Sequence, residues 1–464
     1  MKQILFLLLL IALAALFQVN ITGCAQIMTP TGGPRDTIPP KLIGAAPSER
    51  TINFNAKKIT LNFDEYVQLD NVQQNLIVSP TPKALPVVDY KLKTITVKLR
   101  DTLLPNTTYS INFGNAIKDL NEGNPFRKYT YVFSTGSYID SMEYDGKVII
   151  AETGKIDSTL QVFLYKNAPD SAVETRRPDY ISRLDTLGNF SFSYLPPGLY
   201  KVYAIKDGDG SKTYNSKSEL FGFLDKTVNI NPDVPSDTLY AYAEEKEKPK
   251  TPPVIGKVKP AKELKLKITT SVPPDNQDLL KPFKLELNTP LKTMDISKIK
   301  LSDTLYHNMQ TDSIMLDSTG KIITIYNKWE EDTYYRIVIA KDAIADSLGT
   351  MLLKSDTIKF KSKKKAEYGT LLLHFKNLQL NQNPVLQFVF SNEVIKSYPL
   401  TSPDWSIDLI TPNEYELRIL YDTNKNGKWD PGNYHLKKQP ERVISVNRRV
   451  TVHPNFDNEI DIAL

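Results

Sequence analysis

Short runs of alternating apolar and polar residues constrain the fold of this chain more than any other feature. Four clear runs lie in its first third, at Ile59–Phe63, Thr94–Leu99, Thr108–Phe113 and Tyr129–Phe133. Alternation with period two buries one face of a strand and leaves the other wet, as in antiparallel sheets. The 31 prolines disfavour long helices. The sequence therefore predicts an all-β chain of tandem β-sandwiches, in which frequent turns separate short strands.

The N-terminus has the order of an export signal: Lys2, an apolar run over Ile4–Phe17, then the small residues Thr22 and Gly23. The apolar run is shorter than the roughly 20 residues that a membrane-spanning helix needs. Cys24 follows, and it is the only cysteine in the chain. This pattern resembles a bacterial lipobox, which implies a signal helix within residues 1–23 and a lipidated Cys24 as the new N-terminus. With no second cysteine for an internal disulfide, each domain must rely on its own core.

Residues 24–40 lack periodicity and are rich in Thr, Pro and Gly, which predicts a flexible tether. Residues 41–137, named module A, resemble the bacterial Ig-like domain of S-layer and other surface proteins, and the tether resembles that of Ig-like lipoproteins of Bacteroidota. The family pattern is matched at Thr37–Pro40, Ile59–Glu65, Leu104–Tyr109, Ile117–Asn124 and Phe133–Gly136. The resemblance implies an Ig-like β-sandwich at this place in the chain.

Residues 138–245, named module B, contain a different pattern. A turn at Asp185–Asn189 leads into Phe190–Phe192, and a turn at Pro196–Gly198 leads into Leu199–Ile205. This order is similar to transthyretin-like or carboxypeptidase-regulatory-like domains, which implies a second kind of β-sandwich. Residues 246–262 are charged and rich in proline, which predicts a linker between domains.

The second half of the chain repeats the order of the first half. Asp332–Ile339 parallels Asn106–Phe113 of module A, and Pro412–Leu420 parallels Pro197–Ile205 of module B. The chain is therefore predicted to be an A-B-A′-B′ duplication of a two-sandwich unit. The two further modules are a degenerate Ig-like module A′ at residues 263–362 and a transthyretin-like module B′ at residues 363–464.

One loop of module B′ has the spacing of a calcium site. Asp422, Asn424, Asn426 and Asp430 stand at positions 1, 3, 5 and 9, with glycine at position 6. Oxygen atoms presented at this spacing are ligands that Ca²⁺ prefers, but position 12 is Asn433 and not the Glu of an EF-hand. The alternative is a hairpin loop that is capped by its own side chains. Under either hypothesis the loop would brace the fold and would not catalyse a reaction.

No group of residues predicts catalysis. His307, His374, His435 and His453 are scattered over two modules, and their spacing matches no zinc motif. The adjacent acids Asp64–Glu65 would point to opposite faces of a strand. No phosphate-binding glycine loop or nucleophile elbow occurs. We therefore expect a protein that is not an enzyme, has no catalytic residues and has no cofactor other than a possible structural Ca²⁺.

Aromatic residues leave two interpretations open. Trp329 and Trp405 lie in or beside strand patterns, Trp429 lies in the Asp/Asn-rich loop, and three tyrosines occur within Tyr194–Tyr203. If exposed on one rim, such side chains can stack on sugars or peptides. If buried, they fill the small cores of the sandwiches.

The sequence favours a lipid-anchored, non-catalytic structural or protein-interaction lipoprotein of the bacterial outer membrane. The acyl chains on Cys24, palmitate among them, would bind the bilayer, and Ala25–Met28 lacks the charged residues that tend to follow the cysteine in surface-exported Bacteroidota lipoproteins. The periplasmic side is therefore favoured over the cell surface. Because the net charge of +5 is spread along the chain, nucleic acid is not expected as a partner. Two alternatives stay open, a surface glycan-binding lipoprotein and an enzyme with a site at a module junction.

Overall fold

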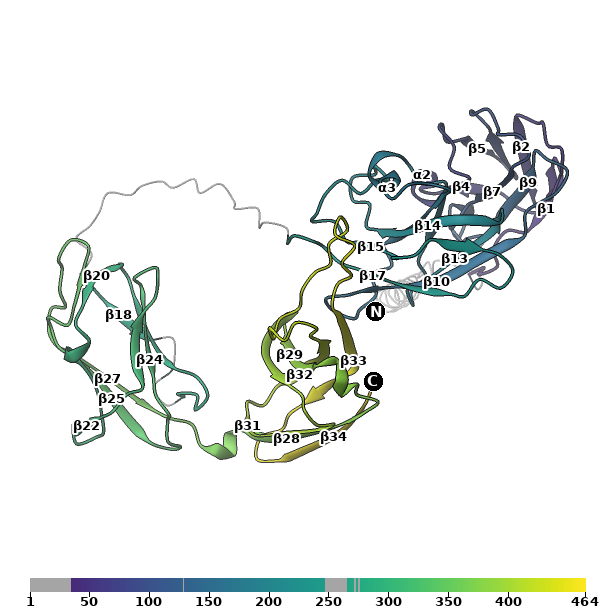
Figure 1. The fold of residues 1–464 in the computed structure, drawn as a ribbon. Helices are drawn as coiled ribbons and strands as arrows, with labels where there is room; N and C mark the ends of the chain where they lie inside the picture. Colours follow the sequence, from purple (N-terminus) through teal and green to yellow (C-terminus); the bar gives the residue numbers. More distant parts are fainter. Residues whose placement is uncertain (1–34, 128, 247–264, 271–272, 274–275) are drawn as a thin grey trace, which may run out of the picture. The chain divides into compact units, whose positions relative to one another are not determined.

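The computed structural model describes residues 35–464, with gaps at 128, 247–264, 271–272 and 274–275. The predicted signal peptide, Cys24, the tether before residue 35 and linker residues 247–262 lie outside the described residues. Regular structure in the described part is almost entirely strand, so the prediction of an all-β chain of tandem sandwiches is confirmed (Figure 1). Within the described residues, no helix is long and apolar enough to cross a membrane.

The backbone divides into two compact units. The first comprises Met1–Met142 together with Asp179–Ile181 and Ser193–Pro197. The second comprises Glu143–Pro178, Ser182–Phe192 and Gly198–Leu464. Module A therefore lies in the first unit, while modules A′ and B′ and most of module B lie in the second.

Module A is built from a sheet in the order β1-β2-β6-β5, a second sheet in the order β4-β7-β9, and the pair β3-β8. Alternation in β2 buries Ile59, Leu61 and Phe63 in one core with Ile111 of β7, as the period-two pattern predicts. The elements are β1 Leu42–Ala46, β2 Lys58–Phe63, β3 Val67–Leu69, α2 Val72–Asn75, β4 Ile77–Ser79, β5 Val87–Lys91, β6 Thr94–Lys98, β7 Thr108–Asn112, β8 Ile117–Asp119 and β9 Thr130–Ser134.

Module A′ repeats the sheets of module A. Its sheet orders are β18-β19-β24-β23, β22-β21-β25-β27 and β20-β26, which correspond strand for strand to module A except for the added β22. The elements are β18 Ile268–Thr270, β19 Phe283–Leu287, β20 Leu291–Met294, η1 Ile296–Lys298, β21 Ile299–Ser302, β22 Asn308–Met309, β23 Ser313–Leu316, β24 Ile322–Tyr326, β25 Tyr334–Ile339, β26 Ile344–Asp346 and β27 Asp356–Lys361.

Module B has one sheet in the order β13-β10-β17 and another in the order β12-β11-β14-β15, with β16 also paired to β14. Tyr165, Tyr200 and Tyr203 are among its fully buried side chains. The elements are β10 Met142–Ile150, β11 Gln161–Lys166, α3 Ala172–Thr175, β12 Tyr180–Arg183, β13 Asn189–Leu195, β14 Gly198–Ile205, β15 Phe221–Phe223, β16 Val228–Ile230 and β17 Asp237–Ala241.

Module B′ has the corresponding sheet orders β31-β28-β34 and β30-β29-β32-β33. The correspondence extends to strand direction, because β10 pairs with β17 in parallel and β28 pairs with β34 in parallel. The elements are η2 Lys365–Glu367, β28 Gly369–Lys376, η3 Leu380–Gln382, β29 Pro384–Phe390, β30 Glu393–Pro399, β31 Asp404–Ile410, β32 Glu414–Tyr421, β33 Arg442–Thr451 and β34 Asp457–Ala463.

The described end of the predicted tether lies against module A. The Arg35 guanidinium donates to the carbonyl of Glu122 at 2.8 Å, and the Asn124 side chain donates to the carbonyl of Asp36 at 3.1 Å. The turn that they contact is held by Asp119, whose side chain accepts three backbone N–H groups. The exact boundary between tether and domain stays a prediction.

Removing one tyrosine hydroxyl should destabilise each Ig-like module by about 1 kcal/mol. The Tyr109 hydroxyl accepts the backbone N–H of Leu104 at 2.8 Å, and the Tyr335 hydroxyl accepts that of Glu330 at 2.9 Å. Tyr109→Phe and Tyr335→Phe leave these donors without a partner in a half-buried site. Urea unfolding of each variant measures the loss. Tyr90→Phe, at a side chain that is 51% exposed, is the control and should change stability by less than about 0.5 kcal/mol. Equal losses in all three variants would contradict the assignment.

Candidate functional site

The loop of residues 422–441, between β32 and β33, begins on a buried carboxylate. Asp422 is only 2% exposed. Its Oδ1 accepts the backbone N–H of Lys425 at 2.7 Å, and its Oδ2 accepts that of Gly427 at 2.7 Å. Gly427 has a φ of 74°, a left-handed conformation that glycine adopts at little cost. One side chain therefore folds the first turn of the loop.

Glu441 closes the other end of the loop. Its carboxylate is buried and accepts the backbone N–H groups of Thr423 at 2.7 Å and Asp430 at 3.1 Å. Its carbonyl accepts the indole N–H of Trp429 at 2.7 Å. The two ends of the loop are thus tied to each other by buried, charge-assisted hydrogen bonds, which are stronger than neutral ones.

The four residues predicted to bind calcium lie together in this loop. The Asp430 Oδ2 accepts the side-chain amide N–H of Asn426 at 3.0 Å and also that of Asn424. Both oxygens of Asp422 accept backbone N–H groups. In this arrangement the carboxylates are turned toward hydrogen-bond donors, which is the geometry of a loop capped by its own side chains. Within the described residues, no group of three or more His, Cys, Asp or Glu could hold a metal ion. Calcium binding here stays a prediction.

The tip of the loop enters module B. The ring of Tyr434 is 3% exposed and lies edge-on to Phe221 and Phe223, with centroid distances of 5.0 and 5.2 Å. Its hydroxyl donates to the carbonyl of Asp170 at 2.7 Å and lies 3.0 Å from the hydroxyl of Tyr203. Burial raises the pKa of Tyr434 to about 12. The loop therefore places one fully satisfied aromatic side chain in an aromatic cluster of the second sandwich.

Polar contacts surround this aromatic contact. The backbone N–H of Tyr434 donates to Glu244 at 2.9 Å, and the amide of Gln439 donates to Asp225 at 2.8 Å. The Lys437 ammonium lies 2.8 Å from Asp170. Hydrogen bonds from Lys201 and Lys437 lower the pKa of Asp170. An apolar centre with a polar rim is the composition of a specific protein interface.

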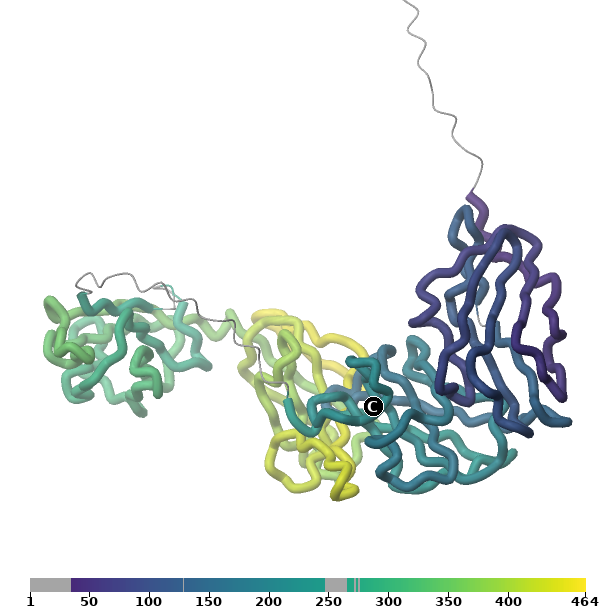
Figure 2. The backbone as a smooth tube through the Cα atoms, turned by 90° about the horizontal axis from the view of Figure 1, so that it is seen from above, coloured from purple at the N-terminus to yellow at the C-terminus, as the bar shows by residue number. Residues whose placement is uncertain are grey.

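A second contact joins the same two modules at the start of β33. The backbone N–H of Val443 donates to the carbonyl of Ala151 at 3.1 Å, and the Lys155 ammonium lies 2.7 Å from Glu416. Burial alone would raise the pKa of Glu416, but hydrogen bonds from Lys155 and Arg418 outweigh it and lower that pKa. Figures 1 and 2 both show the loop of module B′, in yellow, beside the teal strands of module B. The two contacts therefore join modules that are not neighbours in the sequence.

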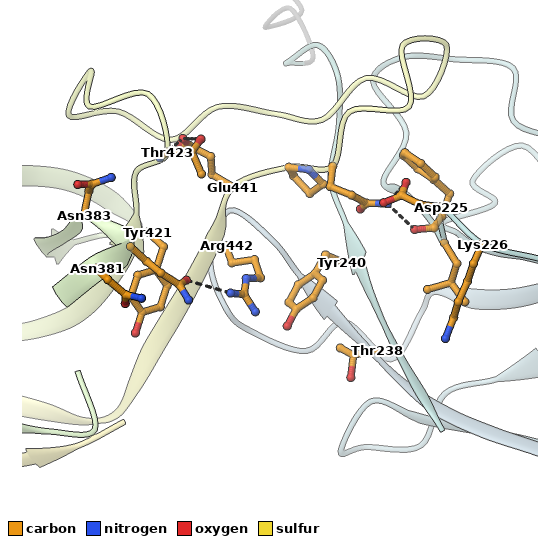
Figure 3. Close-up of a pocket in the computed structure, with 15 residues that line it drawn as sticks. Asp225, Lys226, Thr238, Tyr240, Asn381, Asn383, Tyr421, Thr423, Glu441 and Arg442 are labelled. Atoms are coloured by element: carbon orange, nitrogen blue, oxygen red, sulfur yellow. Dashed lines mark hydrogen bonds between the residues drawn. The ribbon is translucent and has the colours of Figure 1, made fainter. Parts of the chain in front are cut away.

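A groove of about 730 Å³ opens between the two contacts (Figure 3). Tyr240, Thr238 and Lys226 line it from module B, and Arg442 and Asn381 line it from module B′. The volume is within the range of roughly 300–1,000 Å³ that ligand sites usually have. The loop, the aromatic cluster and this groove together form the candidate functional site.

The aromatic residues that the sequence singled out mostly fill cores. Trp329 is 5% exposed, and its indole N–H donates to the carbonyl of Lys281 at 2.9 Å. Tyr200 and Tyr203 are buried, and Trp405 packs against the core of module B′. Tyr194 is partly exposed. No shared rim is formed by the buried members of this set.

The other titratable candidates are not brought together. Asp64 accepts the backbone N–H of Lys41 at 2.8 Å, and burial followed by the charge of Asp119 raises the pKa of Glu65. His307 contacts Asp303 within module A′, and His435 lies 3.6 Å from Glu174 at the edge of the loop contact. His374 lies on β28, far along the chain from both.

His374 should titrate above its ordinary pKa of 6.5. Its Nδ1 lies 2.7 Å from Asp404 and its Nε2 lies 3.1 Å from Glu459, and the hydrogen bond to Asp404 is the largest cause of the raised pKa. A raised folded-state pKa stabilises the fold below about pH 6.5, and this gain disappears as the pH rises through the folded value. NMR titration checks the shift, and Asp404→Asn should lower the pKa of His374. An unchanged pKa in that variant would contradict the pairing.

Sequence reasoning missed the contact made by Tyr434. The usable signal was the length of the connection between β32 and β33, because long loops without secondary structure are uncommon unless they have a function. An aromatic residue near the tip of such a loop was a second signal. The partner side chains in module B had no local pattern that pointed to the loop.

Comparisons with known proteins agree on the kind of domain. Residues 36–135 match the bacterial Ig-like domain family. A search of curated protein sequences found no match. The N-terminal part of the bacterial S-layer protein SbsC is 18% identical over 36% of this chain and 40% of that chain, with a TM-score of 0.16.

Two further solved structures are similar over longer stretches. The Bacillus anthracis TIE protein is 9% identical over 94% of this chain and 75% of that chain, with a TM-score of 0.17. BcpA, the major pilin subunit of Bacillus cereus, is 10% identical over 70% of this chain and 99% of that chain, with a TM-score of 0.16. TM-scores this low support no inference about function. The family match shows that the chain contains a bacterial Ig-like domain at residues 36–135.

Proposed function

We propose that this chain is a lipid-anchored, non-catalytic structural or protein-interaction component of the bacterial cell envelope. The Ig-like domain and the tandem sandwiches support this proposal, because such domains commonly serve as spacers and binding platforms. The strongest single support is the docking of Tyr434 into module B. A desolvated aromatic anchor limits the relative motion of two domains, and a spacer or platform needs a defined geometry.

The lipid anchor is proposed at Cys24, whose acyl chains would hold the protein in the outer membrane, with the periplasmic side favoured. The test is Cys24→Ser in the full chain, expressed in a Gram-negative host that is fed labelled palmitate. We expect the label and membrane fractionation in the parent chain and the loss of both in the variant. Gln26→Ser, in the predicted tether, is the matched control and should keep both. Labelled, membrane-bound Cys24→Ser protein would contradict the lipid anchor.

The side of the membrane has its own test. Intact cells are treated with a protease that cannot cross the outer membrane, and the protein is then detected by immunoblot. Survival of the full-length chain supports the periplasmic side, whereas its loss supports the cell surface. Disruption of the outer membrane before treatment serves as the control, because the chain should then be cleaved in either case.

A further inference from the structure

Arg442 is an exposed cation in the middle of the groove. Its guanidinium donates to the side-chain oxygen of Gln382 at 3.1 Å and lies 5.8 Å from the centroid of the Tyr240 ring. Figure 3 shows this side chain directed into the open space between the two modules. Among the described residues Arg442 forms no ion pair. A guanidinium held in this way keeps donors free for a planar anion such as a carboxylate.

The other charged groups that line the groove already have partners. The Lys226 ammonium lies 2.6 Å from Asp237. Asp225 accepts the amide of Gln439, and the buried carboxylate of Glu441 accepts the N–H of Thr423 at 2.7 Å. Arg442 is therefore the lining charge that is left to select a ligand, and it selects an anion.

Neutral polar groups surround this cation. Asn381, Asn383 and Thr238 line the groove, and within the described residues their side chains make no hydrogen bond to the protein. Asn side chains offer both a donor and an acceptor, which suits pairs of sugar hydroxyls. The partly exposed ring of Tyr240 offers an apolar face for the C–H side of a sugar ring. A peptide ligand would instead favour a free strand edge or apolar side-chain pockets.

We propose that this groove binds an acidic oligosaccharide, with a carboxylate of the sugar on Arg442 and its hydroxyls on the surrounding amide side chains. The groove exists only where modules B and B′ meet, so the docking of Tyr434 builds the site. This inference goes beyond the proposed envelope role and does not depend on the lipid anchor.

Calorimetric titration of the purified full-length chain tests the proposal, with trigalacturonic acid and its methyl ester as the probes. We expect the acid to bind at least about tenfold more tightly than the ester, because only the acid can accept charge-assisted hydrogen bonds from the guanidinium. Arg442→Gln should weaken binding of the acid by about tenfold or more. Asn381→Ala should weaken both probes by a few-fold.

Arg449→Gln is the matched control. Arg449 lies on the same strand, pairs with Glu414 at 2.9 Å and does not line the groove, so the variant should bind like the parent. Melting temperatures of all variants should agree with the parent, since both arginines are exposed. The proposal is overturned if neither probe binds, if acid and ester bind equally, or if Arg442→Gln binds the acid as the parent does. Any of these results would leave the proposed lipid anchor untouched.

Discussion

Tyr434→Ala should destabilise the contact between modules B and B′ by about 3–5 kcal/mol. The substitution removes a side chain that is 3% exposed and packs against Phe221 and Phe223. It also leaves the carbonyl of Asp170 without the hydroxyl that donates to it at 2.7 Å. Differential scanning calorimetry should show the transition of the second unit shifted to lower temperature.

The neighbouring Leu436→Ala gives the control for this prediction. Leu436 lies in the same loop but is 77% exposed, so its loss should change stability by less than about 0.5 kcal/mol. A double-mutant cycle with Lys437→Ala measures how far the aromatic and ionic contacts depend on each other. If Tyr434→Ala melts like the parent chain, the loop does not stabilise the contact.

Asp422→Ala should cost about 2–4 kcal/mol, the second largest effect. The carboxylate is 2% exposed and accepts the backbone N–H groups of Lys425 and Gly427, which would lose their partner in a buried turn. Loss of the turn should also loosen the tip, so Tyr434 should become more accessible. Urea unfolding in EDTA measures the stability term without any contribution from divalent cations.

Asp408→Ala is the control, because Asp408 is exposed on β31. A parent chain that melts at a higher temperature in CaCl₂ than in EDTA, with the increase lost in Asp430→Ala, would support the calcium prediction. An Asp422→Ala variant as stable as Asp408→Ala in EDTA would contradict the hydrogen-bonded account of the loop.

Local patterns predicted the strands well because burial on a sheet depends on neighbours along the chain. The alternation at Ile59–Phe63 gave β2, observed at Lys58–Phe63, and that at Thr108–Phe113 gave β7, observed at Thr108–Asn112. The same reasoning related Asp332–Ile339 to module A, and the sheet orders of the two modules correspond. The repeat was readable because each copy keeps its own periodicity.

Contacts between distant segments could not be predicted in this way. Tyr203 was noticed as one of several tyrosines, but nothing near it in the sequence indicated that Tyr434 would lie 3.0 Å from its hydroxyl. The Asp422 loop was found for its oxygen spacing, yet its carboxylate oxygens accept backbone donors that any loop contains. Arg442 was missed because a lone arginine at the start of a strand has no motif. Side-chain complementarity across a fold leaves no period in the sequence.

Hydrogen–deuterium exchange of the full-length chain tests the docking of the loop most directly. Two backbone N–H groups report on it, that of Tyr434, which donates to Glu244 at 2.9 Å, and that of Val443, which donates to Ala151 at 3.1 Å. The account predicts slow exchange in peptides that contain either residue, and faster exchange of both in Tyr434→Ala but not in Leu436→Ala. Fast exchange at Tyr434 in the parent chain, or unchanged exchange in Tyr434→Ala, would contradict it.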